Sequence, residues 1–449
     1  MCRVCERKRP IYLVIALVAM TMTLLVGLFT TSDLSIYMYI VLLIGFGLVT
    51  VVAMNGSLLS VPFVFYASFC LSLAFGPLIL NSMGYMTYDY QMPLYIGLLL
   101  LFFVGYGFAS FVFGKNSSEK RLLTTNELSL MKKCGLVLFV VGLVATLMYV
   151  ISNRALLLSS GNMNDGRISS LSGNGLLIYI GKLIWLGIFI EYEADVSSDR
   201  NAGLWLKCQI AVAILLSLLI GFRSAAVDAA LVLLFMQNKR KRINNAALII
   251  LVLLIAVGVI VYGAVRDSEF GMVAYSEKLL NELRVNSVNL NNIILTFPSR
   301  VDFQGGYTYL INLFMLAPGP DVDFTLWLKD AINLHFSGGG VTPTLFGELY
   351  INWGWLGTFI GTTLFGAACA LLQRSYLTGN KVLISSLFLG YLRSLIMGGI
   401  ANSMIILLIY LICYFFICFY VKSRKKSLTS TQSLLCVEKR VSLLGIHNE

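Results

Sequence analysis

Charged residues are scarce in this chain. They make up 12% of its 449 residues, whereas 58% are hydrophobic, and the mean hydropathy is +0.83. Soluble proteins contain about a quarter charged residues, because a folded domain needs a charged surface in water. The sequence therefore excludes a cytosolic enzyme, a secreted disulfide scaffold and a disordered protein. Apolar runs of about 18 or more residues recur along the chain and predict an all-α, polytopic integral membrane protein.

The usual metal ligands are scarce as well. The chain has two histidines, His335 and His447. Cys2 and Cys5 have CxxC spacing, but no second pair and no nearby histidine completes a zinc site. Most of the other cysteines fall inside apolar runs, where they act as small hydrophobic residues. We therefore expect no metal site.

Twelve apolar runs are candidate membrane spans. The first follows several basic residues but is too long for a signal peptide and lacks a clear cleavage site. When the chain is threaded back and forth, lysine and arginine concentrate in the loops of one side, for example in KRKR at 239–242 and KSRKK at 422–426. The positive-inside rule makes that side cytoplasmic, so both termini are predicted in the cytoplasm. Topology thus explains the net charge of +11 without a nucleic-acid partner. The predicted spans are 11–29, 34–54, 57–80, 93–113, 134–151, 176–190, 204–220, 223–236, 246–264, 348–372, 382–400 and 403–421.

The predicted organisation is asymmetric. Residues 1–264 hold nine spans, 265–347 form one large external loop, 348–421 hold three spans, and 422–449 form a cytoplasmic tail. The loop contains helix-like stretches at 275–297 and 324–336. No internal repeat is evident, whereas a transporter normally shows two matching halves. A long external loop instead favours chemistry or binding at the outer face.

Three cations fall within the outer half of the predicted membrane region, where charges are unfavourable. Lys182 and Arg393 each lie about 10 Å deep at ~1.5 Å per residue. Arg223 lies in the turn GFRS, before a span that is too short to cross the whole bilayer. One interpretation is that Lys182 and Arg393 extend to the lipid headgroups. The other is a cationic pocket for a phosphate or diphosphate.

Two further side chains are candidates for acid–base chemistry. Glu348 is a lone acid at the start of the tenth span, where a helix dipole alone would also favour it. The aromatic residues after it, Tyr350, Trp353 and Trp355, form either an interfacial belt or a surface for sugar stacking. His335 lies in the predicted external loop and is a candidate because histidine is the usual residue for proton transfer at neutral pH, although a lone loop histidine is often incidental. Asp228 lies five residues after Arg223 and need not pair with it.

The GFRS turn, the long external loop and the segment SGGGVTPTLFGELYINWGWLG at 337–357 together resemble bacterial oligosaccharide repeat-unit polymerases, the Wzy-type O-antigen polymerases. The resemblance implies a glycosyltransferase C-type membrane fold in the inner membrane. It implies transfer of an undecaprenyl-diphosphate-linked glycan to another lipid-linked repeat unit at the periplasmic face, with release of undecaprenyl diphosphate. It also implies no cofactor and a chain-length regulator as partner. We expect Arg223, Arg393 and Lys182 to hold the diphosphate, and Glu348 or His335 to assist the acceptor hydroxyl.

Three alternatives stay open at this stage. The related O-antigen ligase would share the topology and the cations. A flippase or transporter would need no large external loop. A membrane O-acyltransferase would be expected to show a more prominent histidine near a span.

Overall fold

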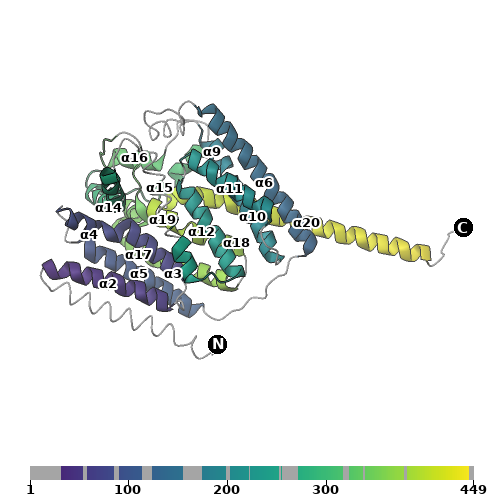
Figure 1. The fold of residues 1–449 in the computed structure, drawn as a ribbon, viewed down its shortest axis with the longest axis horizontal. Helices are drawn as coiled ribbons and strands as arrows, with labels where there is room; N and C mark the ends of the chain where they lie inside the picture. The colour runs from purple at the N-terminus through teal and green to yellow at the C-terminus, as the bar shows by residue number, and fades with distance from the viewer. Residues whose placement is uncertain are drawn as a thin grey trace.

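The computed structural model of the chain is a bundle of helices (Figure 1). It describes residues 32–53, 58–84, 90–113, 124–154, 174–198, 203–221, 223–251, 254, 272–316, 323–336, 339–378 and 382–443. These residues include no strand, so the predicted all-α class is confirmed for them. The helices are α2 (Ser32–Ala53), α3 (Val61–Phe69), η1 (Cys70–Ala74), α4 (Phe75–Ser82), α5 (Gln91–Val112), α6 (Thr125–Ser152), α9 (Gly175–Gly181), α10 (Leu183–Ser197), α11 (Leu204–Leu219), α12 (Arg223–Arg240), α14 (Met272–Thr296), α15 (Thr308–Ile311), η2 (Asn312–Leu316), α16 (Phe324–Ala331), α17 (Thr344–Thr378), α18 (Val382–Gly390), α19 (Leu392–Gly398) and α20 (Ile400–Leu443).

Most of the predicted spans correspond to apolar helices. Three shorter apolar helices overlap the spans predicted at 34–54, 204–220 and 382–400, and α12 overlaps the span at 223–236. The spans at 11–29 and 246–264 fall wholly or mostly outside the described residues. The count of twelve therefore stays a prediction. Within the part of the chain that the structure describes, six helical segments are long and apolar enough to cross a bilayer: Val61–Ser82, Gln91–Val112, Thr125–Ser152, Gly175–Ser197, Thr344–Thr378 and Ile400–Arg424.

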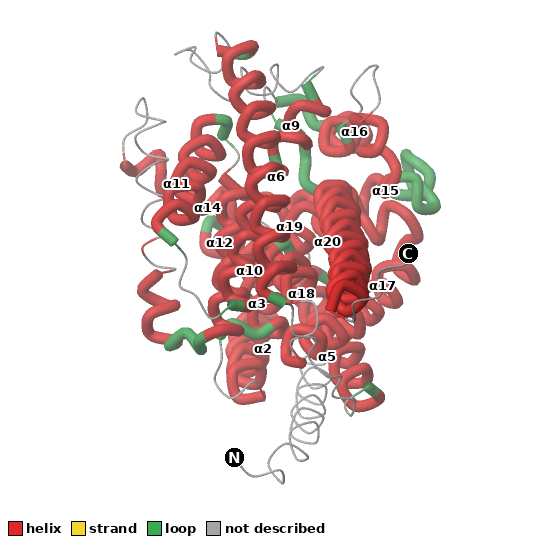
Figure 2. Tube along the Cα trace, turned by 90° about the vertical axis from the view of Figure 1, so that its right-hand side faces the viewer, coloured by secondary structure: helices red, strands yellow, loops and turns green. Residues whose placement is uncertain are grey.

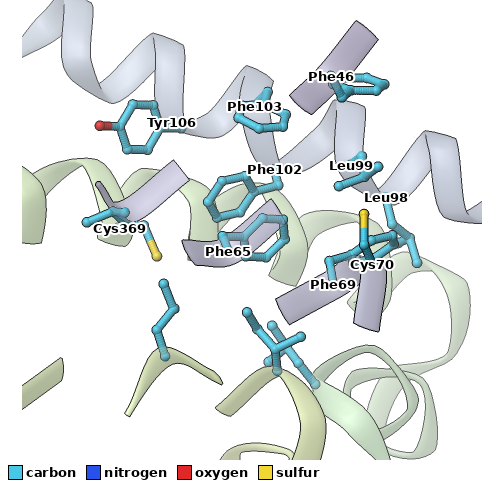
Figure 3. Packing of buried hydrophobic residues seen from close by; sticks show 14 of the residues in the cluster. Phe46, Phe65, Phe69, Cys70, Leu98, Leu99, Phe102, Phe103, Tyr106 and Cys369 are labelled. Atoms are coloured by element: carbon cyan, nitrogen blue, oxygen red, sulfur yellow. The ribbon is translucent and has the colours of Figure 1, made fainter. Parts of the chain in front are cut away.

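One hydrophobic core joins α3, α5 and α17 through buried aromatic rings (Figure 3). The rings of Phe65 and Phe102 stack with their centroids 3.4 Å apart. Glycines let α5 and α17 approach closely, because a Cβ on Gly105 would overlap the carbonyl oxygen of Thr363, and one on Gly366 that of Phe102. In a membrane, lipid tails are as apolar as the helix surfaces, so the hydrophobic effect does not drive helices together. Small residues at the contact instead allow close van der Waals packing of the two helices.

A second core packs α10 along α6 by the same means. A Cβ on Gly142 would overlap the backbone nitrogen of Ile184, and one on Gly187 would meet the carbonyl oxygen of Gly135. The backbones of the two helices are therefore in direct contact. This contact fixes the position of α10 and of Lys182 immediately before it.

The C-terminal end of α10 corrects one predicted boundary. Residues 191–203 were expected to form a loop, but the helix continues to Ser197. The acids in this stretch are compatible with burial because they have partners. Glu193 accepts hydrogen bonds from the hydroxyl of Tyr414 at 3.1 Å and from the backbone nitrogen of Leu383 at 3.3 Å.

Several helices are interrupted within the bundle. A turn at Lys182 separates α9 from α10, and another at Tyr391 separates α18 from α19. Gly354 within α17 has φ +62°, and Gly399 between α19 and α20 has φ +84°, a region that L side chains rarely adopt. Non-helical backbone at membrane depth is tolerated where it is buried in protein or lines a cavity. The interruptions therefore direct attention to the space between these helices.

The two helices predicted in the external loop are present. The stretch 275–297 corresponds to α14, and 324–336 contains α16, which ends earlier than predicted at Ala331. It ends there because Asn333 adopts φ +55°, which a helix cannot continue through. The α14 helix packs against α4 and α17, and α9, α15 and α16 lie at one end of the molecule (Figure 2). The loop boundaries at 265 and 347 stay a prediction.

Candidate functional site

A cavity of about 280 Å³ lies among the interrupted helices. Its walls come from α10, α12, α19 and α20, with one residue each from α14 and the segment before α17. Two of the three predicted cations, Lys182 and Arg393, line it together with Asp228. Residues that are far apart in the sequence thus meet at one place.

Arg393 is held in the cavity wall by a buried carboxylate. Its Nη2 and Nε atoms donate to Oδ1 of Asp228 at 2.9 and 3.2 Å, and Nη2 also donates to the carbonyl oxygen of Ser224 at 3.2 Å. The other oxygen of Asp228 accepts from the hydroxyl of Ser394. The Asp228 side chain is 3% exposed, whereas that of Arg393 is 22% exposed. The Nη1 atom contacts the sulfur of Met397 at 3.4 Å.

Lys182 is positioned by the break between α9 and α10. Its carbonyl oxygen accepts a hydrogen bond from the hydroxyl of Tyr410 at 2.8 Å. Its ammonium lies 4.8 Å from the ring centre of Tyr179, a cation–π contact. Lys182 and Arg393 line the same cavity, and whether this cavity holds an anion stays a prediction.

Neutral polar groups form another wall of the cavity. Asn286 is only 5% exposed, and its Oδ1 atom accepts a hydrogen bond from the hydroxyl of Thr342 at 2.8 Å. The described part of the chain shows no partner for its Nδ2 atom. Asn402 donates to the carbonyl oxygen of Gly398 and accepts from Asn312, both at 2.8 Å. Amides and hydroxyls of this kind match the hydrogen-bonding groups of a sugar.

Glu348 lies outside the cavity wall and is fully buried. Its Oε1 atom accepts from the backbone nitrogen of Ala401 at 3.1 Å and from Thr308 at 3.2 Å, while Oε2 accepts from the backbone nitrogen of Ile400. The carboxylate therefore caps the N-terminus of α20, where the helix dipole favours a negative charge. The Nδ2 atom of Asn352 donates to the Glu348 carbonyl oxygen and to Thr308 Oγ1, at 2.8 and 2.6 Å. The catalytic role expected for Glu348 stays a prediction, and this geometry fits a positioning role.

Two other residues that the sequence predicted for the site, His335 and Arg223, are not among the described side chains that line the cavity. His335 is exposed after α16, and its Nε2 atom lies 2.9 Å from Oδ1 of Asn333. Arg223 is the first residue of α12, but its side chain lies outside what the structure describes. Their roles stay predictions.

The aromatic residues after Glu348 differ in exposure. Tyr350 is 5% exposed and donates its hydroxyl to the carbonyl oxygen of Phe297 at 3.2 Å. Trp353 and Trp355 are 48% and 38% exposed. An interfacial belt and a sugar-stacking surface therefore both stay open for the two tryptophans.

Asp228 and Asn286 are the residues that sequence reasoning missed as parts of the cavity. Asp228 pairs with Arg393, 165 residues away. The side chain of Arg223 lies outside the described residues, so a pair between it and Asp228 is not tested. An acid in one apolar run and an arginine in another were the available indication of a pair. For Asn286, the indication was the density of asparagines along the external helix, in VNSVNLNN at 285–292.

The comparison with known protein families identifies the family of the whole chain. A family model described as O-antigen polysaccharide polymerase Wzy matches residues 12–427. No curated protein sequence and no solved structure matches. The family match includes every helix that lines the cavity. The chain belongs to the O-antigen polysaccharide polymerase Wzy family.

Proposed function

We propose that the cavity between α10, α12, α19 and α20 binds the diphosphate of a lipid-linked repeat unit at the periplasmic face of the inner membrane. The chain is a multi-pass membrane protein of a polymerase family that acts on lipid-linked repeat units. In this proposal both termini lie in the cytoplasm. Undecaprenyl diphosphate is the leaving group, and a chain-length regulator is the expected partner.

The observation that carries the proposal is that Lys182 and Arg393 line the same internal cavity. A glycosyl diphosphate gains negative charge on its leaving oxygen as the glycosidic bond breaks. Fixed cations in a water-poor site stabilise that charge, since they need no reorganisation during the reaction. Arginine is suited to this role because its planar group stays charged and can bind two phosphate oxygens.

The proposed reaction is a single glycosyl transfer. The bond between the anomeric carbon and the diphosphate oxygen breaks, and the oxygen of an acceptor sugar hydroxyl bonds to that carbon. The hydroxyl proton passes to water or to the departing diphosphate. The Nδ2 atom of Asn286 is placed to hydrogen-bond a sugar hydroxyl next to the diphosphate.

In this mechanism, no residue of the cavity wall accepts or donates a proton. An attacking sugar hydroxyl needs at most a modest base when the leaving group is good. Glu348 and His335 remain the two candidates from the sequence for this assistance. The cations therefore carry the mechanism, and the role of Glu348 has a separate test below.

The test is polymerisation by purified protein in lipid vesicles supplied with a lipid-linked repeat unit, with products separated as a ladder. Arg393→Ala is expected to slow ladder formation by about 100-fold or more, as removal of a single group that stabilises transition-state charge does. Arg284→Ala is the matched control, because Arg284 lies on α14 and outside the cavity wall. Its ladder is expected to form at the normal rate.

A second variant separates binding from folding. Arg393→Ala alone leaves the buried Asp228 without its cation, which destabilises the protein. Arg393→Met combined with Asp228→Asn removes both charges and restores a neutral wall. This double variant is expected to fold and to remain inactive. A folded double variant with a normal ladder would show that Arg393 is only structural and would overturn the proposal.

A further inference from the structure

A second, narrower crevice adjoins the cavity. It lies between α6, α9, α10, α11 and the start of α12. The two spaces share three wall residues, Lys182, Trp185 and Ala225. The crevice therefore adjoins the polar cavity at the cation Lys182.

The lining of the crevice is chiefly apolar. Leu177, Ile184, Leu216 and Ile220 contribute aliphatic side chains. Ser217 also lines it, but its hydroxyl already accepts a hydrogen bond from the indole nitrogen of Trp185 at 3.3 Å. Hydrocarbon is thus the chemical class that fits this space.

The helices around the crevice expose apolar side chains on their outer faces. Ile151 on α6 is 65% exposed, Leu176 on α9 is 56% exposed, and Leu219 on α11 is 48% exposed. In a membrane protein, side chains of this kind contact lipid tails. A hydrocarbon chain in the crevice would therefore be close to the bilayer and would not need to cross a polar layer.

We propose that the crevice holds the start of the polyprenyl tail of the lipid-linked donor, with its diphosphate at Lys182 and Arg393. This inference rests on the proposed function of the cavity. A polyprenyl diphosphate has a charged head directly joined to a hydrocarbon chain, and the two adjoining spaces have the same division at Lys182. The crevice thus makes the enzyme selective for the tail as well as for the glycan.

The proposed location of the tail can be tested by filling the crevice with a larger side chain. Ala213 lies on α11, lines the crevice and is 1% exposed. Ala213→Phe places a ring in the space meant for hydrocarbon. Leu215→Phe is the matched control, because Leu215 is on the same helix but is 66% exposed on the outer face. Each variant is supplied with two donors that carry the same glycan diphosphate, one on an undecaprenyl tail and one on a methyl group, which has no hydrocarbon chain to place in the crevice.

The wild type is expected to extend the undecaprenyl donor faster than the methyl donor. Ala213→Phe is expected to lose about tenfold or more on the undecaprenyl donor while its rate on the methyl donor is kept. Leu215→Phe should behave as the wild type. Equal losses on both donors, or no loss on either, would overturn the inference. A wild type that extends neither donor would instead overturn the proposed function.

A binding measurement covers the case in which Ala213→Phe fails to fold. A photoreactive amino acid at Leu216 is expected to label undecaprenyl diphosphate that carries no sugar. Unlabelled geranylgeranyl diphosphate in excess is expected to reduce this labelling. Labelling of ordinary phospholipid to the same extent, without competition by prenyl diphosphate, would contradict a prenyl site.

Discussion

Replacing Glu348 by glutamine is expected to preserve the fold and most of the polymerase activity, whereas replacing it by alanine is expected to abolish both. The carboxylate caps α20 through the backbone nitrogens of Ile400 and Ala401. With its oxygen in the place of Oε2, glutamine keeps both of these bonds. Its amide nitrogen then faces Thr308 Oγ1, which can accept a hydrogen bond.

The sizes of the two effects follow from these contacts. Alanine leaves two backbone N–H groups without an acceptor, at about 1–3 kcal/mol each. The expected loss of about 2–6 kcal/mol is a large part of the ~5–15 kcal/mol by which a protein is stable. Glutamine exchanges charge-assisted bonds for neutral ones, a change of about 1 kcal/mol that lowers the rate less than about tenfold. A general base at Glu348 would instead make Glu348→Gln slower by about 100-fold to 10,000-fold.

The assay combines thermal unfolding in detergent with the rate of ladder formation by the same preparation. Glu127→Gln is the matched control, since Glu127 is also a buried acid at a helix N-terminus and forms a capping box with Thr124. Both glutamine variants should unfold at similar temperatures and extend chains at similar rates. A Glu348→Gln protein that melts normally but has lost its activity would refute the positioning role and restore the catalytic one.

Three further outcomes are expected. Asp228→Ala should lower the free energy of unfolding by about 3 kcal/mol, measured by denaturant titration, because it leaves the Arg393 cation unpaired in the cavity wall. Asn286→Ala should raise KM for the repeat unit by about tenfold, the value of one lost hydrogen bond, with a smaller change in kcat. Steady-state kinetics would contradict this if kcat fell and KM did not change. Gly366→Val should destabilise the protein by about 1–3 kcal/mol, seen as a lower melting temperature, because it forces α17 from α5. Gly97→Val on α5 is its control, since no atom lies within 4 Å of a Cβ at that position.

The spans could be predicted because they depend on local composition. The length of an apolar run and the location of basic loops suffice to find a membrane helix. The interruptions and some helix ends could not be predicted in this way. The α10 helix continues to Ser197 because Glu193 finds partners on α18 and α20, nearly two hundred or more residues further along the chain.

The candidate site was predictable to the extent that it depends on isolated charges. Lys182 and Arg393 could be identified because a cation at membrane depth is energetically unfavourable unless a partner or a bound ligand compensates its charge. Their meeting in one cavity, and the pairing of Arg393 with Asp228, depend on contacts between distant helices. The contacts of Glu348 could not be predicted for the same reason, and its catalytic role stays a prediction. Its sequence context shows only the start of its own helix, whereas the helix that it caps begins 52 residues later.

The cap at α20 also explains why side-chain cations are needed in the cavity. The N-terminus of a long helix is a ready-made site for phosphate, because its free N–H groups and dipole attract anions. At α20 this site is already occupied by the carboxylate of Glu348, whose oxygens accept from Ile400 and Ala401. The positive end of the helix is therefore neutralised, although Asn402 one position further lines the cavity. In the proposed function, Lys182 and Arg393 hold the diphosphate, so removing their charges is expected to affect binding more than any change to the end of α20.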